Sequence, residues 1–361
     1  MPHPAYQQML GVMQSRRGPY AGLDIPEFYA LVEALFTPEQ AELNNALPKR
    51  PVTAEALARQ MQRPKRQVQE VLETMADNGL CATFSINGRR CYKSLPFMPG
   101  IFEYQFMPGL FSERHKEIAR LIKAYKTAFE TAQGVKRITF PTTRVIPVDK
   151  TIQAGNVIHT YDQVVSYIEK YDPVGVGTCY CRHAARLRGE DIHNMPMEVC
   201  LWFGKSAEYA IERLGGRKLS KTEALALLDR CEAAGLVHMS RNTAEDIDFL
   251  CNCDRWHCEV VTHVLKQPRP GWVFNSGFEP AVAADACTAC ELCVNRCPAE
   301  ALTLDGRSLP QVNPERCFGC GVCASGCPEG AITLQTKAGF PEPPRTAKAL
   351  VEALKANALK G

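Results

Sequence analysis

Long apolar runs, strong net charge and a signal-peptide pattern are all missing from this sequence. No stretch of its 361 residues contains eighteen consecutive apolar side chains, whereas a membrane-spanning helix needs about 20, so no membrane span is expected. The formal net charge is +3 with 22% charged residues, which argues against a strongly charged partner for the chain as a whole. Arg16, Arg17 and Pro19 stand where a signal peptide would have its apolar core.

Motifs of several common enzyme classes are missing as well. The chain contains no G-x-G-x-x-G fingerprint, no P-loop lysine and no G-x-S-x-G nucleophile elbow. We therefore expect neither a dinucleotide site of that kind nor serine-hydrolase chemistry.

Cysteine is the residue type that stands out, with seventeen copies. Disulfides belong to oxidising compartments, and the N-terminus does not look like a signal peptide. We therefore expect a cytoplasmic protein, in a reducing compartment, whose grouped cysteines bind metal.

The densest cysteine group is a tandem repeat near the end of the chain. Two copies of C-x2-C-x2-C-x3-C-P begin at Cys287 and at Cys317. This is the bacterial two-cluster ferredoxin pattern, in which the fourth cysteine of each run ligates the other cluster. The first 4Fe-4S cluster is then expected on Cys287, Cys290, Cys293 and Cys327. The second is expected on Cys317, Cys320, Cys323 and Cys297.

Two other interpretations of the repeat fit less well. Zinc does not require eight cysteines in two identical runs, and disulfides do not suit a reducing compartment. Gly319, Gly321 and Gly326 are expected to let the backbone pass close to the second cluster. Apolar segments at 301–304 and 331–334 follow the two runs, and each is expected to form one strand of a small hairpin.

The same part of the chain is acidic. Residues 279–335 contain three Lys/Arg and seven Asp/Glu, a balance of −4, which leaves about +7 for the rest of the chain. An acidic surface suits docking on a basic patch of a redox partner. The stretch resembles the bacterial two-4Fe-4S ferredoxin module, which implies two 4Fe-4S clusters and electron transfer.

The N-terminal part has the element order of a winged helix. A helical pattern is followed by a capping box at Thr37, a helix capped by Thr53 and a further helix after Pro64. Asn87-Gly88 lies between two short strand patterns, which is a strong hairpin signal. Residues 25–95 therefore resemble the winged helix-turn-helix fold.

A winged helix can bind DNA or protein. DNA binding would use basic and polar side chains of the last helix and the hairpin: Lys65, Arg66, Gln69, Arg89 and Arg90. Residues 21–96, however, hold nine Lys/Arg and nine Asp/Glu, and phosphate neutralisation dominates DNA affinity. Nucleic acid is thus an alternative partner that the charge disfavours.

A third group of cysteines lies in the middle of the chain. Two C-x-C pairs and two further cysteines bracket a helix that a capping box at Ser220 opens. The six residues are Cys179, Cys181, Cys200, Cys251, Cys253 and Cys258. Arg182, His183 and Arg186 beside the first pair would lower thiolate pKa values. These ligands suit a third iron–sulfur cluster or a zinc ion.

Cysteines and histidines that stand alone are expected to be structural. The cysteines expected to be simply buried are Cys81, Cys91 and Cys231. The histidines expected to be hydrogen-bonded are His159, His238 and His263.

The whole layout resembles a group of anaerobic iron–sulfur proteins. These combine a helix-turn-helix-like N-terminus, a C-Y-C-R-H segment, a C-N-C segment and a dicluster ferredoxin, and the resemblance implies an electron-transfer role. In that group more cysteines often follow the C-N-C directly, whereas here Asp254 follows. For a third cluster we expect as ligands Cys200, Cys251 and Cys253 with Cys179 or Cys181.

The chain is long enough for several domains, and we expect an α+β multidomain protein. The expected parts are a winged-helix-like domain (21–96), a mainly helical central domain with the third metal site (97–278), the dicluster ferredoxin (279–340) and a tail helix (341–361).

These features predict an electron-transfer protein or subunit that exchanges single electrons with a redox protein, a flavoprotein or another oxidoreductase subunit. Two alternatives stay open. One is a redox-sensing transcription regulator that uses the winged helix, and the other is a catalytic iron–sulfur enzyme working at the central cysteines. The sequence favours a non-catalytic subunit over an enzyme.

Overall fold

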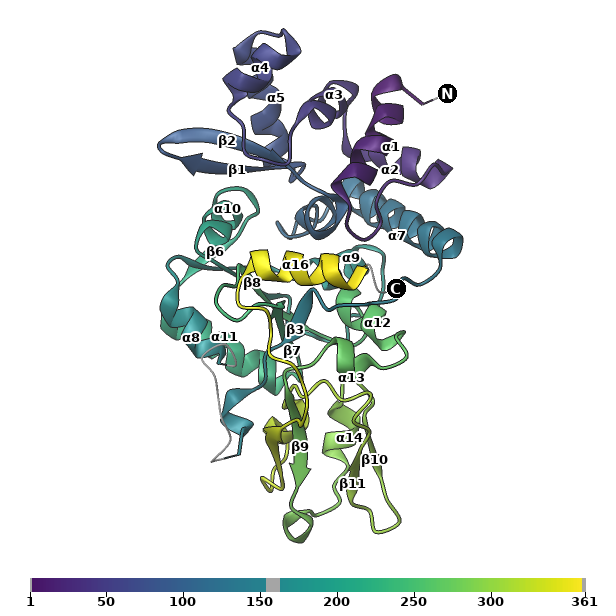
Figure 1. The fold of residues 1–361 in the computed structure, drawn as a ribbon, viewed down its shortest axis with the longest axis vertical. Helices are drawn as coiled ribbons and strands as arrows, with labels where there is room; N and C mark the ends of the chain where they lie inside the picture. The colour runs from purple at the N-terminus through teal and green to yellow at the C-terminus, as the bar shows by residue number, and fades with distance from the viewer. Residues whose placement is uncertain (1, 154–162, 359–361) are drawn as a thin grey trace. The chain divides into compact units, whose positions relative to one another are not determined.

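The computed structural model describes residues 2–153 and 163–358 (Figure 1). It is 45% helical and 16% strand, which agrees with the predicted α+β class. His159 and the end of the predicted tail segment, beyond residue 358, lie outside the described residues. None of the described helices combines the length and the apolar composition needed to span a bilayer.

The chain folds into two compact units, and each is assembled from separate stretches of sequence. Unit 1 comprises residues 1–134, 177–192 and 208–217, and unit 2 comprises residues 135–176, 193–207 and 218–361. This division does not follow the four predicted segments, whose boundaries stay a prediction.

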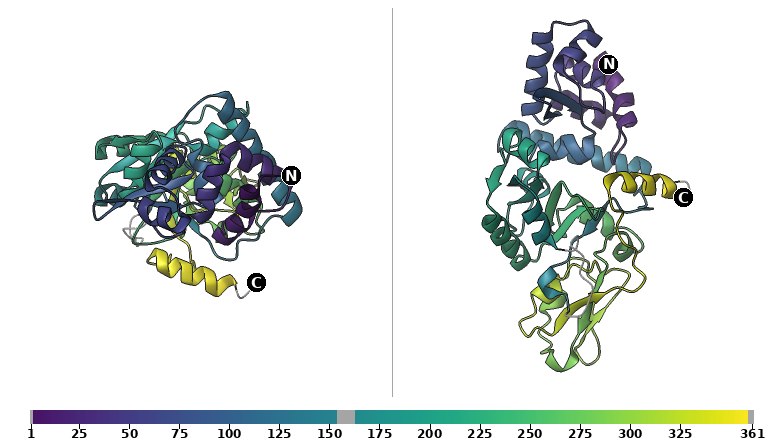
Figure 2. Two further views of the ribbon diagram at one scale, coloured as in Figure 1. Left: turned by 90° about the horizontal axis from the view of Figure 1, so that it is seen from above. Right: turned by 60° about the vertical axis from the view of Figure 1, so that its left-hand side comes forward.

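Unit 1 begins with five helices and a hairpin (Figure 2). The helices are α1 (Pro4–Arg16), α2 (Pro26–Leu35), α3 (Pro38–Ala46), α4 (Ala54–Met61) and α5 (Lys65–Asp77). Strands β1 (Cys81–Ile86) and β2 (Arg89–Ser94) then pair antiparallel. The element order expected for this part is present, while its assignment as a winged helix stays a prediction.

Local sequence signals set the starts of these helices. The Thr37 hydroxyl accepts the Gln40 N–H and the Gln40 side chain accepts the Thr37 N–H, so the predicted capping box before α3 is confirmed. Thr53 accepts the Ala56 N–H at the start of α4, as predicted.

An aromatic cluster forms part of the core of unit 1. An irregular turn (Phe97–Ile101) and α6 (Phe102–Tyr104) lead from the hairpin to the long helix α7 (Glu113–Gln133). Phe28, Phe97, Phe102 and Tyr125 are all buried there, with ring centroids 4.8 to 6.5 Å apart. Such pairs add stabilisation beyond the area they bury.

Later stretches of sequence complete unit 1. They form α9 (Tyr180–Leu187) and most of α10 (Lys205–Arg213). Tyr209 on α10 is buried and donates a hydrogen bond of 2.9 Å to the Cys81 carbonyl on β1. The hairpin is therefore fixed by a residue far away in sequence.

A six-stranded sheet in the order β3-β7-β8-β5-β4-β6 lies mostly in unit 2. Its strands are β3 (Thr143–Val145), β4 (Val174–Thr178), β5 (Glu198–Phe203), β6 (Arg217–Leu219), β7 (Val237–Arg241) and β8 (Phe249–Cys253). The helices between and after them are α8 (Val164–Lys170), α11 (Lys221–Ala233), α12 (Glu259–Leu265) and α13 (Pro270–Val273).

A mainly helical central domain was predicted for residues 97–278, and this sheet was not. Each strand has only three to six residues, and most neighbours in the sheet are not neighbours in sequence. An alternating pattern of that length is too short to separate a strand from a loop or a helix.

Two further strand pairs surround the cysteine repeat in unit 2. Strand β10 (Leu302–Leu304) pairs with β11 (Pro310–Val312), so the first apolar segment forms the predicted hairpin. Strand β12 (Ile332–Thr336) pairs instead with β9 (Phe278–Val282), which precedes both runs. The second segment therefore closes the two ends of the ferredoxin region together rather than forming a local hairpin.

Three helices accompany these strands. Two short ones, α14 (Leu292–Arg296) and α15 (Val322–Ser325), lie inside the two cysteine runs. The predicted helix of the tail is α16 (Ala347–Ala358).

Charged side chains in unit 1 gather around Glu73 on α5. Arg90 and Tyr92 donate to its carboxylate at 3.1 and 2.5 Å, and Arg213 donates to it as well. Burial alone would raise the pKa of Glu73, but these hydrogen bonds lower it to about 2.

We predict that Glu73→Gln destabilises the protein at pH 7 by about 1–3 kcal/mol, because it removes the charged acceptor that two arginines and a tyrosine share. A carboxyl group with a depressed pKa stabilises the fold above its unfolded pKa and loses that contribution as the pH falls through its folded pKa. The variant should therefore lose less stability than the wild type between about pH 5 and pH 2.

Urea unfolding across this pH range measures the effect. Glu70→Gln is the matched control, since Glu70 lies on the same helix in an exposed pair with Arg66 and such pairs contribute about 0–1 kcal/mol. Equal losses in the two variants would contradict the role given to Glu73.

Candidate metal centres

Two hollows in the ferredoxin region are each lined by four cysteines. The first encloses about 370 Å³, including space open to solvent. Its cysteines are Cys287, Cys290, Cys293 and Cys327. The second encloses about 320 Å³ on the same measure. Its cysteines are Cys297, Cys317, Cys320 and Cys323.

Each hollow thus gathers one of the two sets that the crossing rule predicts. Three cysteines come from one run and the fourth comes from the other. The Cys297 thiolate also lies close enough to contribute to the raised pKa values of Cys317, Cys320 and Cys323. The raised pKa of Cys293 instead has contributions from Cys287 and Cys290. Four soft sulfur donors around a small hollow fit a 4Fe-4S cluster.

Backbone N–H groups point at the sulfur atoms. The Ala301 N–H donates to the Cys297 Sγ at 3.2 Å, and the Gly319 N–H donates to the Cys317 Sγ at 3.4 Å. Such hydrogen bonds stabilise thiolates and influence cluster potentials.

Burial disfavours the charged thiolate and therefore raises the pKa of a free thiol. It raises the pKa of Cys317 to about 11, and the nearby thiolate of Cys297 adds to this while Lys337 opposes it. Thiols with raised pKa values are neutral at pH 7, so binding of a cluster would release their protons.

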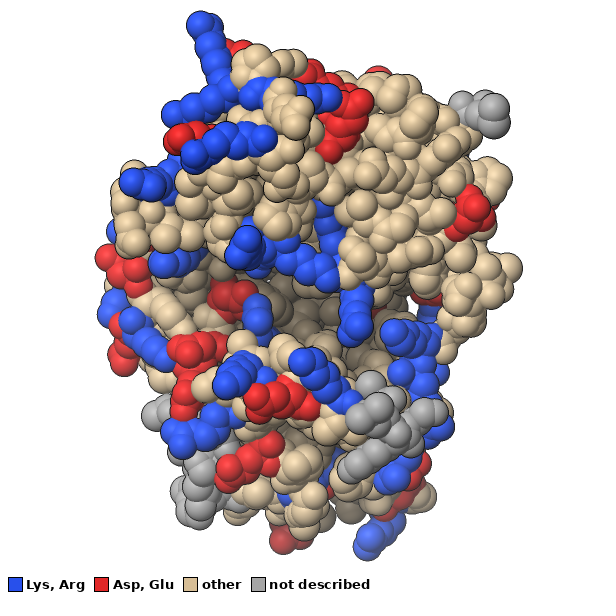
Figure 3. Space-filling view, turned by 45° about the horizontal axis from the view of Figure 1, so that its top comes forward, with Lys and Arg blue, Asp and Glu red and all other residues tan. Residues whose placement is uncertain are grey.

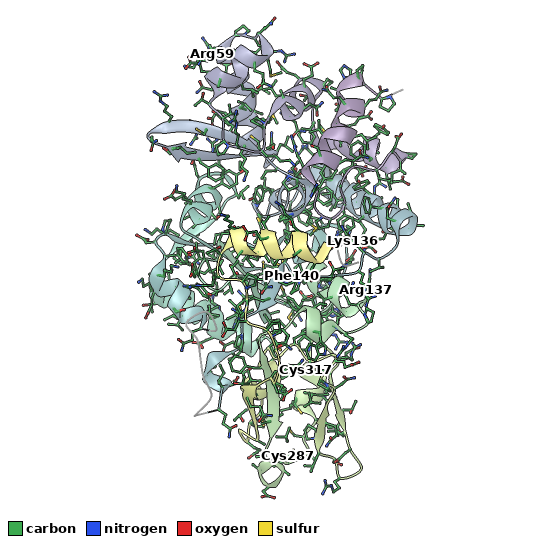
Figure 4. All side chains as sticks on the ribbon, in the orientation of Figure 1. Arg59, Lys136, Arg137, Phe140, Cys287 and Cys317 are labelled. Atoms are coloured by element: carbon green, nitrogen blue, oxygen red, sulfur yellow. The ribbon has the colours of Figure 1, made fainter. Side chains whose placement is uncertain are left out.

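The two hollows differ in exposure. Cys290 in the first is exposed and Cys287 is half-buried, whereas Cys297, Cys317 and Cys323 in the second are buried. Figure 4 labels Cys287 near the tip of this region and Cys317 further in. The first site is therefore the one open to solvent.

A buried lysine stands beside the second hollow. The Lys337 Nζ donates to the carbonyl oxygens of Gly271 and Pro314 at 3.2 and 3.0 Å and lies 4.7 Å from the centre of the Trp272 ring. Its side chain is 5% exposed, and burial lowers its pKa. An isolated lysine in a C-terminal stretch carries no signal from which sequence reasoning could have found it.

Two glycines of the second run lie close to other parts of the chain. Gly319 has φ +63°, and a Cβ there would meet the carbonyl oxygen of Phe278. A Cβ on Gly326 would meet the Arg296 side chain. Glycine at 319 is thus also favoured by its contact with the backbone of Phe278, and the expected approach of these glycines to the cluster stays a prediction.

The structure brings three of the central cysteines together. Cys251 and Cys253 lie on β8, and Cys258 is the N-cap of α12. The Cys251 and Cys258 thiols are within hydrogen-bonding reach of the Cys253 thiol and, together with burial, raise its pKa well above the usual range. Cys200 lies on the neighbouring strand β5, whereas Cys179 and Cys181 belong to unit 1 at the start of α9.

The lone residues behave as expected. Cys81, Cys91 and Cys231 are buried. The His238 Nδ1 lies 2.6 Å from the Asn252 Oδ1, and the His263 Nε2 lies 3.1 Å from the Lys136 carbonyl oxygen. These histidines are hydrogen-bonded, as predicted.

Two of the three arginines considered for DNA contact form ion pairs within unit 1. Arg66 pairs with Glu70 at 2.8 Å, and Arg90 bridges Glu73 and Glu212. Figure 3 shows basic and acidic side chains interspersed on the face in view. Their pairing with carboxylates reduces the positive charge that Arg66 and Arg90 offer to phosphates.

One family model matches the chain. Residues 286–331 match the model described as a 4Fe-4S dicluster domain. A comparison with curated proteins gave no match. The matched domain supports binding of 4Fe-4S clusters and indicates iron–sulfur electron transfer or another redox function.

We predict that Cys297→Ser changes the same EPR signal as Cys323→Ser, although Cys297 and Cys293 share one run. The reason is that Cys297 lines the second hollow. EPR spectra of the three reduced variants decide the matter. A Cys297→Ser spectrum that matches Cys293→Ser would contradict the crossing.

A second prediction concerns Lys337→Met. Removing the positive charge destabilises a cluster's reduced state, so the potential of the second cluster should fall. A loss of about 1 kcal/mol corresponds to about 40 mV for a one-electron couple. Redox titration followed by EPR measures the shift, with Lys355→Met on α16 as control. An equal shift of both clusters would contradict a local role.

Proposed function

We propose that the protein is an iron–sulfur electron-transfer protein or subunit with two 4Fe-4S clusters held by the predicted sets of four cysteines. The observation that carries the proposal is the pair of four-cysteine hollows within the region that matches the dicluster family. When bound, the clusters would supply one-electron redox chemistry.

The surface around the first hollow supports docking at that end. Cys290 and Leu292 are exposed there, with Leu292 at 44%. Glu291 and Glu329 line the same hollow and are exposed. A small apolar spot with a carboxylate rim suits a partner that offers a basic patch.

Two of the three basic residues of this region make contacts within the fold. Arg296 donates to the carbonyl oxygens of Glu232 and Ala233 at 2.9 and 3.1 Å. Arg316 pairs with Glu300 at 3.5 Å and donates to the Ala299 carbonyl at 3.0 Å. The third, Arg307, is exposed and pairs with Asp305 at 3.9 Å. Seven carboxylates against three basic side chains still leave an acidic excess for association.

The partner we propose is a redox protein, a flavoprotein or another oxidoreductase subunit with a complementary basic surface. We propose a reducing compartment such as the cytoplasm, because the cysteine groups must stay reduced to bind iron. The role is that of a carrier or a non-catalytic subunit.

Electron exchange with a basic cytochrome c as probe tests the proposal. We expect the dithionite-reduced protein to reduce the probe with a rate constant that falls steeply with salt. The double variant Glu291→Gln/Glu329→Gln should be about threefold to tenfold slower at low salt and less salt-dependent. Stopped-flow absorbance measures both effects.

Glu352→Gln on α16 is the control and should leave the rate unchanged, since Glu352 is exposed but does not line the hollow. If the reconstituted protein holds about four irons or fewer, the two-cluster assignment is wrong. If it holds about eight but the probe is reduced equally by both variants, docking does not occur at the first site.

A further inference from the structure

Two central cysteines share one face of strand β8. Cys251 and Cys253 are separated by a single residue, and alternate residues of a strand point to the same side. Asn252 between them faces the other side, where its Oδ1 lies 2.6 Å from the His238 Nδ1 and its Nδ2 donates to the Val199 carbonyl at 2.7 Å. The two thiols are therefore held to one face by a buried polar contact on the opposite face.

The neighbouring strand adds a third cysteine to this face. Strand β5 pairs with β8 in a register that sets Leu201 opposite Leu250 and Trp202 opposite Phe249. Continued by one residue beyond these paired positions, the same register would set Cys200 opposite Cys251. Residues directly opposite in an antiparallel pair project to the same face, with Cβ atoms about 4.5–5.5 Å apart.

A tight turn after β8 leads to a fourth cysteine, Cys258. The Asp254 carboxylate accepts the N–H groups of Trp256 and His257 at 2.8 and 2.6 Å. The chain then enters α12 with Cys258 at the N-cap. The Cys258 thiol reaches the Cys253 thiol from this position.

We propose that Cys200, Cys251, Cys253 and Cys258 bind a third iron–sulfur cluster. Four sulfur donors select iron–sulfur clusters or zinc among common metal centres. No three His, Cys, Asp or Glu side chains in the described ranges are arranged as ligands of one metal ion, and this includes the eight ferredoxin cysteines. The choice of a cluster over zinc rests on the surroundings of the site.

The surroundings of the site also favour a redox centre. Cys253 and Cys258 belong to one continuous buried core with Cys293, Cys297 and Cys317 of the ferredoxin runs, and Cys251 packs against it. An apolar core that excludes water is a suitable medium between redox centres.

Arg255 connects the two regions directly. It lies in the turn between Cys253 and Cys258, and its Nη1 donates to the Cys297 carbonyl at 3.3 Å. The Arg255 guanidinium also pairs with the carboxylate of Glu300, which is three residues after Cys297. The central site is therefore tied to the run that supplies the crossing ligand of the second hollow.

This arrangement gives the third cluster the position of a relay next to the second ferredoxin site. The presence of the cluster does not depend on the proposed function, whereas its use as a relay does. Cys179 and Cys181 are not part of the proposed set, which revises the expectation that one of them would be a ligand.

Metal analysis of the full-length chain, purified anaerobically, tests the site. We expect about twelve irons and twelve sulfides in the wild type and about eight of each in Cys253→Ser, with the EPR signals of the ferredoxin pair retained. Cys231→Ala should keep about twelve, because Cys231 is buried in α11 of the same unit but is not one of the four proposed ligands. Cys251→Ser, at a half-buried position, repeats the test if Cys253→Ser fails to fold.

Three results would overturn the proposal. The first is a wild type with about eight irons, with or without one zinc. The second is unchanged iron in a folded Cys253→Ser or Cys251→Ser. The third is loss of the extra iron in Cys179→Ser or Cys181→Ser but not in Cys200→Ser, which would show a different ligand set. Loss of electron exchange from a protein that keeps about twelve irons would instead contradict the proposed function alone.

Discussion

The arrangement of the ferredoxin region depends on an exchange in which each cysteine run supplies one cysteine to the hollow of the other run. Neither run supplies four sulfurs to one hollow, because Cys297 lies with the second set and Cys327 with the first. The pairing of β9 with β12 joins the residues before the first run to those after the second. This closure keeps the two runs together, so sheet pairing and sulfur placement support each other.

The two hollows also differ in their surroundings. The first is exposed and rimmed by carboxylates, whereas the second is buried beside Lys337 and joined by Arg255 to the central cysteines. Exposure, local charge and hydrogen bonds to sulfur are the main means by which a protein adjusts cluster potentials. Two sites with similar ligand spacing are thus given different surroundings.

Features with a local physical cause could be predicted from the sequence. The capping box at Thr37, the cap at Thr53 and the hairpin at Asn87-Gly88 each depend on residues within a few positions, and all three are observed. The ferredoxin cysteines are equally local in their spacing. The match over residues 286–331 covers this part of the chain.

Features that depend on long-range pairing could not be predicted. The six-stranded sheet is made of short strands that pair out of order, and only this pairing brings β5, which carries Cys200, beside β8. The close approach of Gly319 to the Phe278 carbonyl on distant β9 is another example. Lys337 acquires its importance only through burial against Gly271 and Pro314. In each case the cause lies far away in sequence.

The division of the chain into interleaved stretches has a consequence for biosynthesis. Unit 1 needs residues up to 217 before its last stretch is present, and the first hollow needs Cys327 before its fourth sulfur exists. Domains tend to fold as units while the chain is made. The sulfur set of the first hollow is therefore complete only after residue 327 has been made, and a chain that stops before Cys327 would present three thiols without the fourth.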